Sequence, residues 1–270
     1  LTDMNMPGMD GLTLLANTLK ADPSVSVIVV TAHGTIETAV EAMKKGAEDF
    51  LTKPVENDHL RVTLDRVFRK RALLEENKRL VSENEALKED MRIRYHLATA
   101  VGRSEEAVQL LEKIHFHMKT RSHTLVLGEP GSGEVDVAKM LHYNGPWAGR
   151  PLLFFDCFSV PEHFHETQLF GEEASSRPGD AKKGAAGLIE RAHSGSLVIS
   201  SVHRLNPACQ SRLSRVIREE QTQRTGGTRF YPVSVKVIFT ANPSDLDAAV
   251  AAGGFKRDLH EILKENAIVI

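Results

Sequence analysis

The fold of the larger part of this chain is decided by residues 124–135, which read Thr-Leu-Val-Leu-Gly-Glu-Pro-Gly-Ser-Gly-Glu-Val. An apolar strand comes first, a glycine-rich turn follows, and a helix fits from about Val135 to His142. Glycines at such a strand-to-helix turn let backbone amides face a phosphate at the helix N-terminus. These residues therefore predict a phosphate-binding loop inside an α/β domain.

The sequence beyond this loop continues the alternation of strands and helices. Apolar runs predict strands at Leu152 to Asp156, Ser196 to Ser200 and Val233 to Thr240, and helical patterns fit Pro207 to Glu220 and Ser244 to Ala252. Such alternation is typical of a parallel sheet with crossover helices. We expect this α/β domain to begin near residue 101.

Residues 1–55 show the same alternation on a smaller scale. A helical pattern covers Leu12, Leu15 and Leu19, a strand fits Val25 to Val30, a second helix fits Ile36, Val40 and Met43 and closes at Gly46, and Phe50 to Thr52 fits another strand. The β-branched run suits a strand that is buried on both faces. A second parallel sheet is predicted, and because the chain opens on Leu1 near a strand end, we expect an N-terminal fragment.

Residues 57–97, between the two α/β segments, contain no Pro or Gly. Leu73, Leu80 and Leu87 recur every seven residues, beside a second heptad row of Leu60, Val67, Leu74 and Val81. Asn77 and Asn84 fall midway between the leucines, where a buried Asn favours two-stranded pairing. The spacing predicts a dimerising coiled coil, with a single solvated helix lying on its own domain as the alternative.

Composition places the chain among ordinary soluble globular proteins, with 41% hydrophobic and 26% charged residues. Lys and Arg number 34 against 36 Asp and Glu, so no overall basic field attracts nucleic acid, and we expect DNA contact only if a further domain follows Ile270. No apolar run approaches the roughly 20 residues that span a bilayer. We therefore expect a cytoplasmic protein without membrane contact.

Metal sites and disulfides are not expected from the sequence. Cys157 and Cys209 are too few for a disulfide framework or a zinc site and should be small buried residues. Two histidine pairs lack carboxylate or cysteine companions at ligand spacing, namely His115 with His117 and His163 with His165.

Three polar residues close the three predicted strands of the first segment: Asp3, Thr31 and Lys53. Ligands of an open parallel sheet bind at the carboxyl ends of its strands, so these side chains should converge. An aspartyl nucleophile needs a cation and hydrogen-bond donors for the incoming phosphoryl group. Lys53 supplies the charge and Thr31 a hydroxyl, which predicts a phosphoryl-accepting site on Asp3.

The motifs around these residues resemble the receiver domain of bacterial response regulators over residues 1 to about 65. Asp-Xaa-Xaa-Met-Pro-Xaa-Met-Asp-Gly starts at Asp3, Val-Thr-Ala contains Thr31, and Thr-Lys-Pro contains Lys53. The resemblance implies part of a flavodoxin-like parallel sheet, phosphorylation of Asp3 by a sensor histidine kinase, and a cis peptide before Pro54. It also implies that Phe50 switches its rotamer together with Thr31.

The same resemblance implies a Mg²⁺ site. Asp3 and the backbone carbonyl of Asn5 would contribute to it, together with an acidic pair that this chain does not contain. We therefore expect the intact receiver to bind Mg²⁺ and the chain as given not to bind it normally.

Residues 98–270 resemble the central AAA+ domain of the sigma-54-dependent transcription activators, the NtrC-type enhancer-binding proteins. The matching stretches are the Gly-Glu-Pro-Gly-Ser-Gly loop, Gln168 to Gly171, Ala192 to Leu197, Gly226 to Arg229 and Phe255 to Leu259. The resemblance implies a nucleotide site built from Gly128, Gly131, Ser132, Gly133 and the residue at 134, with Asn242 as the first sensor. We expect the chain to end before the helical lid.

The phosphate-binding loop departs from the family at its two most important side chains. Glu134 replaces the Lys that contacts the phosphates, and Val135 follows where a Ser or Thr would bind Mg²⁺. An anion at about 4 Å from a phosphate is repelled by about 4 kcal/mol at an effective dielectric constant of 20. Lys139 cannot substitute, because five residues place it about 140° round the helix and about 7.5 Å along it.

Other functional positions of the AAA+ domain depart as well. Ser200 and Ser201 stand in place of the acidic Walker B pair, and Lys256 and Ile262 stand at the two arginine positions. The Gly-Ala-Phe-Thr-Gly-Ala loop that contacts sigma-54 corresponds to Ser175 to Asp180. Phosphoryl transfer relies almost wholly on positioning and electrostatics, so we expect weak or absent ATP binding, no hydrolysis and no sigma-54 contact.

The sequence thus predicts an α/β chain with three parts: a partial receiver domain at 1–65, a coiled-coil linker at 66–97 and an AAA+ domain at 98–270. We expect a phosphorelay regulator of transcription, dimeric or larger, whose degenerate AAA+ domain serves assembly or docking. Two alternatives stay open at this point. One is a divergent but active sigma-54 activator, and the other is a decayed gene product that no longer signals.

Overall fold

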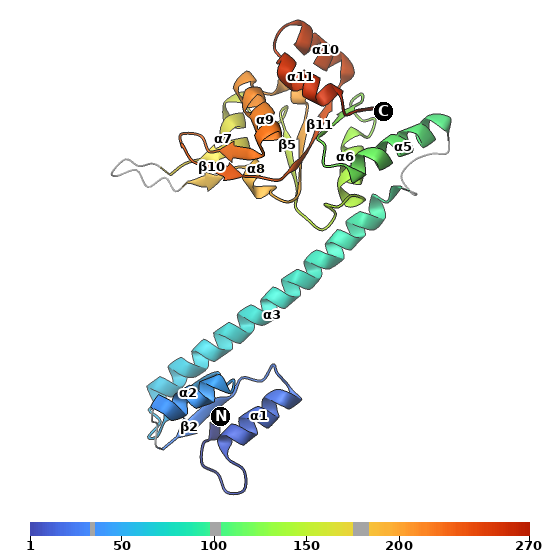
Figure 1. Cartoon of the computed structure of the whole chain (residues 1–270). Helices are drawn as coiled ribbons and strands as arrows, with labels where there is room; N and C mark the ends of the chain where they lie inside the picture. Colours follow the sequence, from blue (N-terminus) through green and yellow to red (C-terminus); the bar gives the residue numbers. More distant parts are fainter. Residues whose placement is uncertain (33–35, 98–103, 175–183) are drawn as a thin grey trace. The chain divides into compact units, whose positions relative to one another are not determined.

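The computed structural model describes residues 1–32, 36–97, 104–174 and 184–270 (Figure 1). These residues form two compact units, Leu1–Glu85 and Ala86–Ile270. No described helix combines the length and the apolar character needed to cross a membrane.

The first unit contains a three-stranded parallel sheet with the strand order β1-β2-β3. Its elements are β1 (Thr2–Asp3), α1 (Gly11–Ala21), β2 (Ile28–Thr31), α2 (Ile36–Lys44), β3 (Asp49–Thr52) and the first part of α3 (Asn57–Arg94). Leu15 and Ala42 from α1 and α2 pack with Val29 in one cluster, whereas Val67 from α3 packs with Ile28 and Leu51 in another. Helices therefore cover both faces of β2.

Two details of this unit differ from the sequence prediction. β2 begins at Ile28 and not at Val25, because the amide of Val25 bonds to the carbonyl of Asp22 in a turn at 3.3 Å. α2 forms where it was predicted, but Val40 and Met43 are exposed. The face of α2 that packs on the sheet carries the small side chains Ala39 and Ala42, which a search for large apolar residues overlooks.

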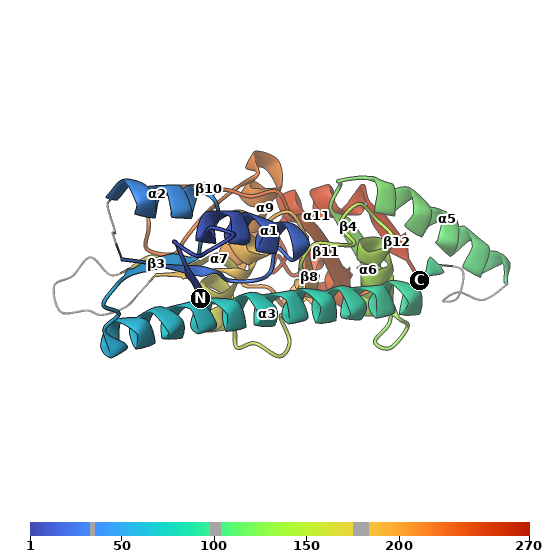
Figure 2. The ribbon, with the colours of Figure 1, turned by 90° about the horizontal axis from the view of Figure 1, so that it is seen from below.

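Helix α3 runs for 38 residues without a break (Figures 1 and 2). Val67 in its first part packs against Ile28 and Leu51 of the three-stranded sheet, and Thr63 is buried as well. The leucines of the predicted coiled-coil seam are exposed, with 66%, 51% and 62% of the surface of Leu73, Leu80 and Leu87 open to solvent. Exposed leucines at this spacing leave an apolar row along the helix.

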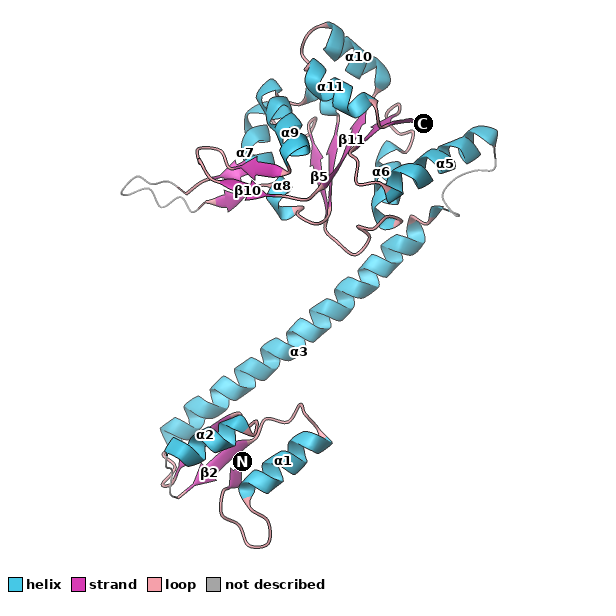
Figure 3. Cartoon of the chain, in the orientation of Figure 1, coloured by secondary structure: helices cyan, strands magenta, loops and turns pink. Residues whose placement is uncertain are grey.

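The second unit is built on a five-stranded parallel sheet with the order β12-β4-β11-β8-β5. Figure 3 shows its strands in magenta and its helices in cyan. The sheet strands are β4 (Thr124–Leu127), β5 (Leu152–Asp156), β8 (Ser196–Ser200), β11 (Lys236–Ala241) and β12 (Ala267–Val269). The helices are α5 (Glu105–Lys119), α6 (Glu134–Tyr143), η1 (Glu162–Phe164), α7 (His165–Phe170), α8 (Leu188–Arg191), η2 (Val202–Arg204), α9 (Pro207–Glu219), α10 (Pro243–Ala251) and α11 (Arg257–Lys264). Short strands β6 (Gly171–Glu172) with β7 (Ala185–Ala186), and β9 (Gln221–Gln223) with β10 (Phe230–Pro232), form two antiparallel pairs.

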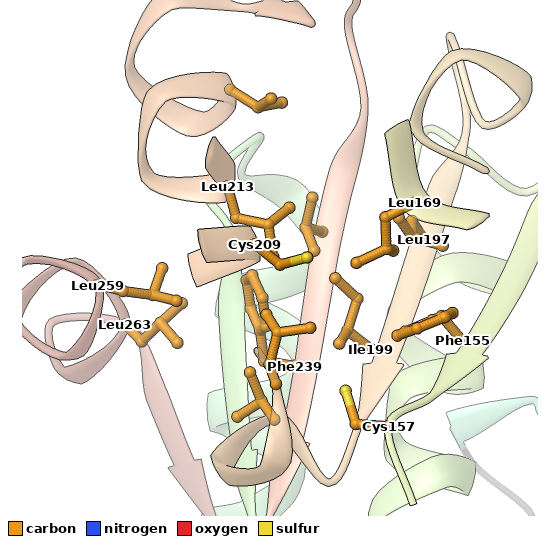
Figure 4. Packing of buried hydrophobic residues seen from close by; sticks show 14 of the residues in the cluster. Phe155, Cys157, Leu169, Leu197, Ile199, Cys209, Leu213, Phe239, Leu259 and Leu263 are labelled. Carbon is orange, nitrogen blue, oxygen red and sulfur yellow. The ribbon is translucent and has the colours of Figure 1, made fainter. Parts of the chain in front are cut away.

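The core of this unit lies on both faces of the sheet. On one face α5 and α6 pack against Val126, Val198 and Ile238. On the other face, α7, α9 and α11 pack against the alternate residues of the same strands, including Leu125, Leu197, Ile199 and Phe239 (Figure 4). Both cysteines are free and buried in this second cluster, as predicted. The result is a layered α/β/α domain, as the alternation of elements predicts.

The predicted strand from Val233 starts three residues later, at Lys236. The amide of Val233 bonds to the carbonyl of Glu220 at 2.8 Å, and the amide of Ser234 bonds to Nδ1 of His193 at 3.3 Å. Residues 233–235 therefore connect the β9–β10 hairpin to the sheet. An apolar run alone cannot distinguish such a connection from the strand that follows it.

Two histidines, one buried and one partly buried, are held in the neutral form. Burial, with the nearby charge of Lys236, lowers the pKa of His123 to about 4, and the ring accepts a hydrogen bond from the amide of Val237 at 3.1 Å. Burial likewise lowers the pKa of His142 to about 4, and its Nδ1 lies 2.8 Å from the hydroxyl of Ser196.

We expect the unfolding free energy to fall as the pH drops from 6.5 toward about 4. In this range both histidines are protonated in the unfolded chain but stay neutral in the folded chain. The loss is up to about 1.4 kcal/mol per pH unit for each residue. In a His123→Asn/His142→Asn variant, amide groups replace the Nδ1 contacts without titrating. Urea denaturation should show a shallower pH dependence for this variant. The control His115→Asn, at an exposed position, should keep the original slope.

Candidate functional site

The receiver-like site lies at the carboxyl edge of the three-stranded sheet. Asp3 ends β1 and Thr31 ends β2, and Lys53 directly follows β3. The ammonium of Lys53 forms an ion pair with the Asp3 carboxylate. This hydrogen bond is the main reason that the pKa of Asp3 lies below its ordinary value. Asp3 and Lys53 are therefore in contact, and Thr31 ends the strand that lies between theirs.

The surroundings of this edge follow from the strand register. The amide of Lys53 bonds to the carbonyl of Thr31 at 2.7 Å, and the Thr31 side chain is buried. The peptide between Lys53 and Pro54 is cis, as the receiver resemblance implied. Phe50 lies on β3 opposite Val29, two residues before the strand end, and is partly buried. Its predicted switching role is not tested by this geometry.

The oxygen atoms at this edge are of the kind that Mg²⁺ takes. Asp3 offers a carboxylate that also accepts the amide of Asn5 at 3.4 Å, and Asn5 offers its backbone carbonyl. Asp10 does not contribute, because its carboxylate caps α1 by accepting the amide of Thr13 at 2.6 Å. Asp3 and Asn5 fit one part of a Mg²⁺ site, and the other oxygens of the octahedron would come from water or further protein groups.

The phosphate-binding loop has the geometry that its glycines require. It joins β4 to α6, and Gly131 and Gly133 adopt positive φ angles of 87° and 100°. A Cβ atom at either position would meet nothing within 4 Å, so glycine is needed for its backbone conformation and not for space. The amide of Ser132 bonds to the carbonyl of Glu129 at 2.9 Å and tightens the turn.

The first residue of α6 brings an acidic side chain to this loop. Glu134 is the first residue of α6, and its carboxylate lies 3.5 Å from the hydroxyl of Ser132. Lys139 points elsewhere: its ammonium donates to the Tyr95 hydroxyl at 2.9 Å and to the Asp136 carboxylate at 3.3 Å, and it lies 4.8 Å from the centre of the Tyr95 ring. Tyr95 and Asp136 therefore hold the Lys139 ammonium in this structure.

The neighbouring strand ends complete this edge of the sheet. Ser200 ends β8 opposite Asp156 at the end of β5, and Ser201 follows in a left-handed conformation with φ 54°. The Asp156 carboxylate accepts hydrogen bonds from the amide of Phe158 and the hydroxyl of Ser159. The side chain of Asn242 caps α10 by accepting the amides of Ser244 at 2.9 Å and Asp245 at 3.4 Å.

The two predicted arginine positions lie at the start of α11 and within it. The ammonium of Lys256 donates to Ser211, its amide bonds to Oε1 of Gln210 at 2.7 Å, and Ile262 is partly buried. Ser175 to Asp180 lies outside the described residues. No group of three or more His, Cys, Asp or Glu side chains in the described residues could hold a metal ion.

Sequence reasoning missed Tyr95 and Asp156. Tyr95 stacks on Tyr143 with ring centres 5.8 Å apart, and its carbonyl accepts the side chain of Asn144 at 2.8 Å. It follows the long helix in the sequence, where nothing marks it as a contact of α6. Asp156 ends a predicted strand. Its place at the carboxyl end of a parallel strand could have marked it as a candidate site residue.

A phosphoacceptor-like edge and a phosphate-loop α/β unit together define a response regulator with an AAA+ output domain. Residues 1–65 match the response regulator receiver domain, and residues 100–269 match the sigma-54 interaction domain. The chain therefore belongs to the family of response regulators with a sigma-54 interaction domain and is homologous to the NtrC-type regulators.

Several characterised proteins are similar to this chain. The C4-dicarboxylate transport transcriptional regulatory protein DctD of Rhizobium meliloti is 34% identical over 96% of the chain and 55% of its own length. The transcriptional regulatory protein ZraR of Escherichia coli is 31% identical over 100% of the chain and 58% of its own length. A crystal structure of NtrX from Brucella abortus in complex with ATP superposes with a TM-score of 0.58 at 30% identity, over 99% of this chain and 55% of that one. The chain thus spans little more than half the length of these relatives.

Proposed function

We propose that this chain belongs to a phosphorelay regulator of transcription in which the AAA+ unit assembles or docks without hydrolysing ATP. A sensor histidine kinase would phosphorylate Asp3. The observation that carries the proposal is the charge at the phosphate-binding loop, where the first residue of α6 is the acid Glu134. Lys139 is the only Lys or Arg of α6, and Tyr95 and Asp136 hold it.

The loop does not fit a nucleoside triphosphate. Its backbone keeps the open, glycine-dependent conformation, but Glu134 would repel the phosphates that a lysine attracts. Ser200 and Ser201 offer hydroxyls where a carboxylate would hold Mg²⁺ and polarise water. The carboxylate of the nearby Asp156 already accepts two hydrogen bonds, from Phe158 and Ser159 in the turn that follows it.

A second candidate function is a divergent, active sigma-54 activator. It is favoured by the matched family model and by the solved structure of NtrX, a relative that contains ATP. An active activator would also contact sigma-54. The segment at the corresponding position in this chain is Ser175 to Asp180. A decayed product that no longer signals is the third possibility, and phosphoryl transfer to Asp3 would exclude it.

We expect the full-length protein that contains this chain to hydrolyse no ATP above the rate of its Ser201→Ala variant. Glu134→Lys should restore measurable binding of a fluorescent ATP analogue, since it exchanges repulsion for attraction, but no turnover, because Ser200 and Ser201 stay unchanged. The control Glu129→Lys adds the same charge at an exposed loop position outside the helix. Turnover by the unmodified protein would replace the docking proposal by the divergent-enzyme one.

The full-length protein should accept a phosphoryl group on Asp3 from a small phosphodonor such as acetyl phosphate, since Lys53 pairs with the Asp3 carboxylate. Phosphate-binding gel electrophoresis and mass spectrometry would measure the labelling. Lys53→Met should reduce it strongly, whereas Lys45→Met, at a lysine that pairs with Glu41, should not. Equal labelling of Asp3→Asn would show that the phosphoryl group sits elsewhere.

The exposed row on α3 supports a dimeric coiled coil. Taking Leu73, Leu80 and Leu87 as the central apolar positions places Asn77 and Asn84 at the alternate core positions. Two chains paired in parallel and in register would bring each Asn against its own copy, where the two amides satisfy each other. The single-helix alternative would leave these leucines in water.

Sedimentation velocity of the 270-residue chain tests this pairing. We expect a dimer at micromolar concentration that Leu80→Asp converts to monomer, because a carboxylate would be buried without a partner. Lys78→Asp makes a similar acidic change two residues away, outside the seam, and should stay dimeric. A monomeric parent chain would refute the coiled coil.

A further inference from the structure

The two core columns of the proposed coiled coil run through Leu73 and through Asn77, and both become cationic ahead of these residues. The position seven residues before Leu73 holds Arg66. The position seven residues before Asn77 holds Lys70. Core positions of a coiled coil face the core positions of the partner helix. Two copies that pair in register would therefore bring like charges together just ahead of Leu73.

Both cations are paired with carboxylates of their own chain. The Arg66 guanidinium forms an ion pair with the carboxylate of Asp49, the first residue of β3. The Lys70 ammonium lies 2.6 Å from the carboxylate of Glu48, the residue before that strand. The two acidic side chains are 17% and 23% exposed, whereas the two cations are 67% and 61% exposed. The first unit thus supplies one anion for each cation of the core columns.

The two carboxylates are also held by the unit that carries them. The second oxygen of Asp49 accepts the amide of Phe50 at 2.9 Å. The second oxygen of Glu48 accepts the hydroxyl of Ser26 at 3.5 Å. Because these bonds restrict both acidic side chains, pairing with the cations costs less conformational entropy than pairing between two freely rotating side chains.

The core columns change their packing partner along α3. Thr63, seven residues before Lys70, is only 2% exposed, and Val67 packs against strands β2 and β3 of its own unit. A second copy of the chain cannot pack against a position that is already buried. Residues 71–80 are all exposed. Pairing with a second copy is therefore free to begin at Leu73, directly after the cationic positions.

The charges that flank the core columns fit a second copy in parallel orientation. One flanking column is acidic and contains Glu76, Glu83 and Asp90. In a parallel pair, each residue of this column faces the residue five positions further along the partner helix, which places Glu83 beside Lys88 of the second copy. An antiparallel pair would set the acidic column against itself. The described part of α3 thus favours a second copy of this chain as the occupant.

We propose that Glu48 and Asp49 control the pairing of two copies of α3, because they neutralise the cations that would repel each other ahead of Leu73. This inference rests on the coiled coil proposed above and names the contact that regulates it. The strength of pairing then depends on how β3 lies against α3. The same strand leads to Lys53, the partner of Asp3, so β3 connects the phosphoacceptor site with the paired segment.

The dimer dissociation constant of the 270-residue chain, measured by sedimentation velocity over a concentration series, tests the proposal. Glu48→Gln/Asp49→Asn keeps hydrogen-bond acceptors but removes both charges. We expect it to weaken the dimer about fivefold at low salt and by much less at 1 M salt, where charge repulsion is screened. The control Glu37→Gln/Glu41→Gln removes two charges from exposed positions of α2 and should leave the dissociation constant unchanged.

The cations provide the second half of the test. Arg66→Gln/Lys70→Gln removes the charges that need neutralising, so it should dimerise at least as tightly as the parent chain. Adding Glu48→Gln/Asp49→Asn to it should change the dissociation constant by less than about twofold.

Three outcomes would contradict the proposal. The first is an unchanged dissociation constant for Glu48→Gln/Asp49→Asn in a chain whose dimer Leu80→Asp still disrupts, and it overturns this inference alone. The second is an equal loss of affinity with and without the cations, because the carboxylates would then act elsewhere. The third is a monomeric parent chain, which overturns this inference together with the coiled coil.

Discussion

Parallel strands must all end at the same edge of their sheet, and this constraint places the residues of both candidate sites that end or follow a strand. In the first unit it brings Asp3, Thr31 and Lys53 together from three separate strands. In the second unit it brings the phosphate-binding loop beside Asn242, which directly follows β11, with Ser200 at the end of the next strand, β8. The crossover helices that the parallel order demands also build the two cores, because each strand needs cover on both faces.

The side chains that build the fold are different from those that would carry chemistry. Leu125, Leu197 and Phe239 point into the core, where a change would open a cavity. Glu134 lies partly exposed at a helix start, where a charge reversal disturbs no packing. The core residues that hold the fold are therefore separate from the residue at the start of α6.

The sequence predicted the sheets, the loop and the edge residues because these depend on local patterns of alternation and glycine. It misplaced the starts of β2 and β11, since hydrogen bonds from Val25 and Val233 to residues outside the strands decide them. It overlooked the small residues through which α2 packs, and the Tyr95 contact that holds Lys139, which joins residues 44 positions apart. The boundaries at 65 and 97 and the roles of the site residues stay predictions.

Because α3 is unbroken, the number of residues between two of its side chains fixes the angle between them around the helix axis. Each residue advances the helix by about 1.5 Å and turns it by about 100°. Loss of one residue would swing Leu87 out of line with Leu73, whereas loss of seven would nearly restore the alignment. We therefore expect insertions and deletions in this linker to be tolerated when they comprise whole heptads, since these keep the leucines on one side of the helix.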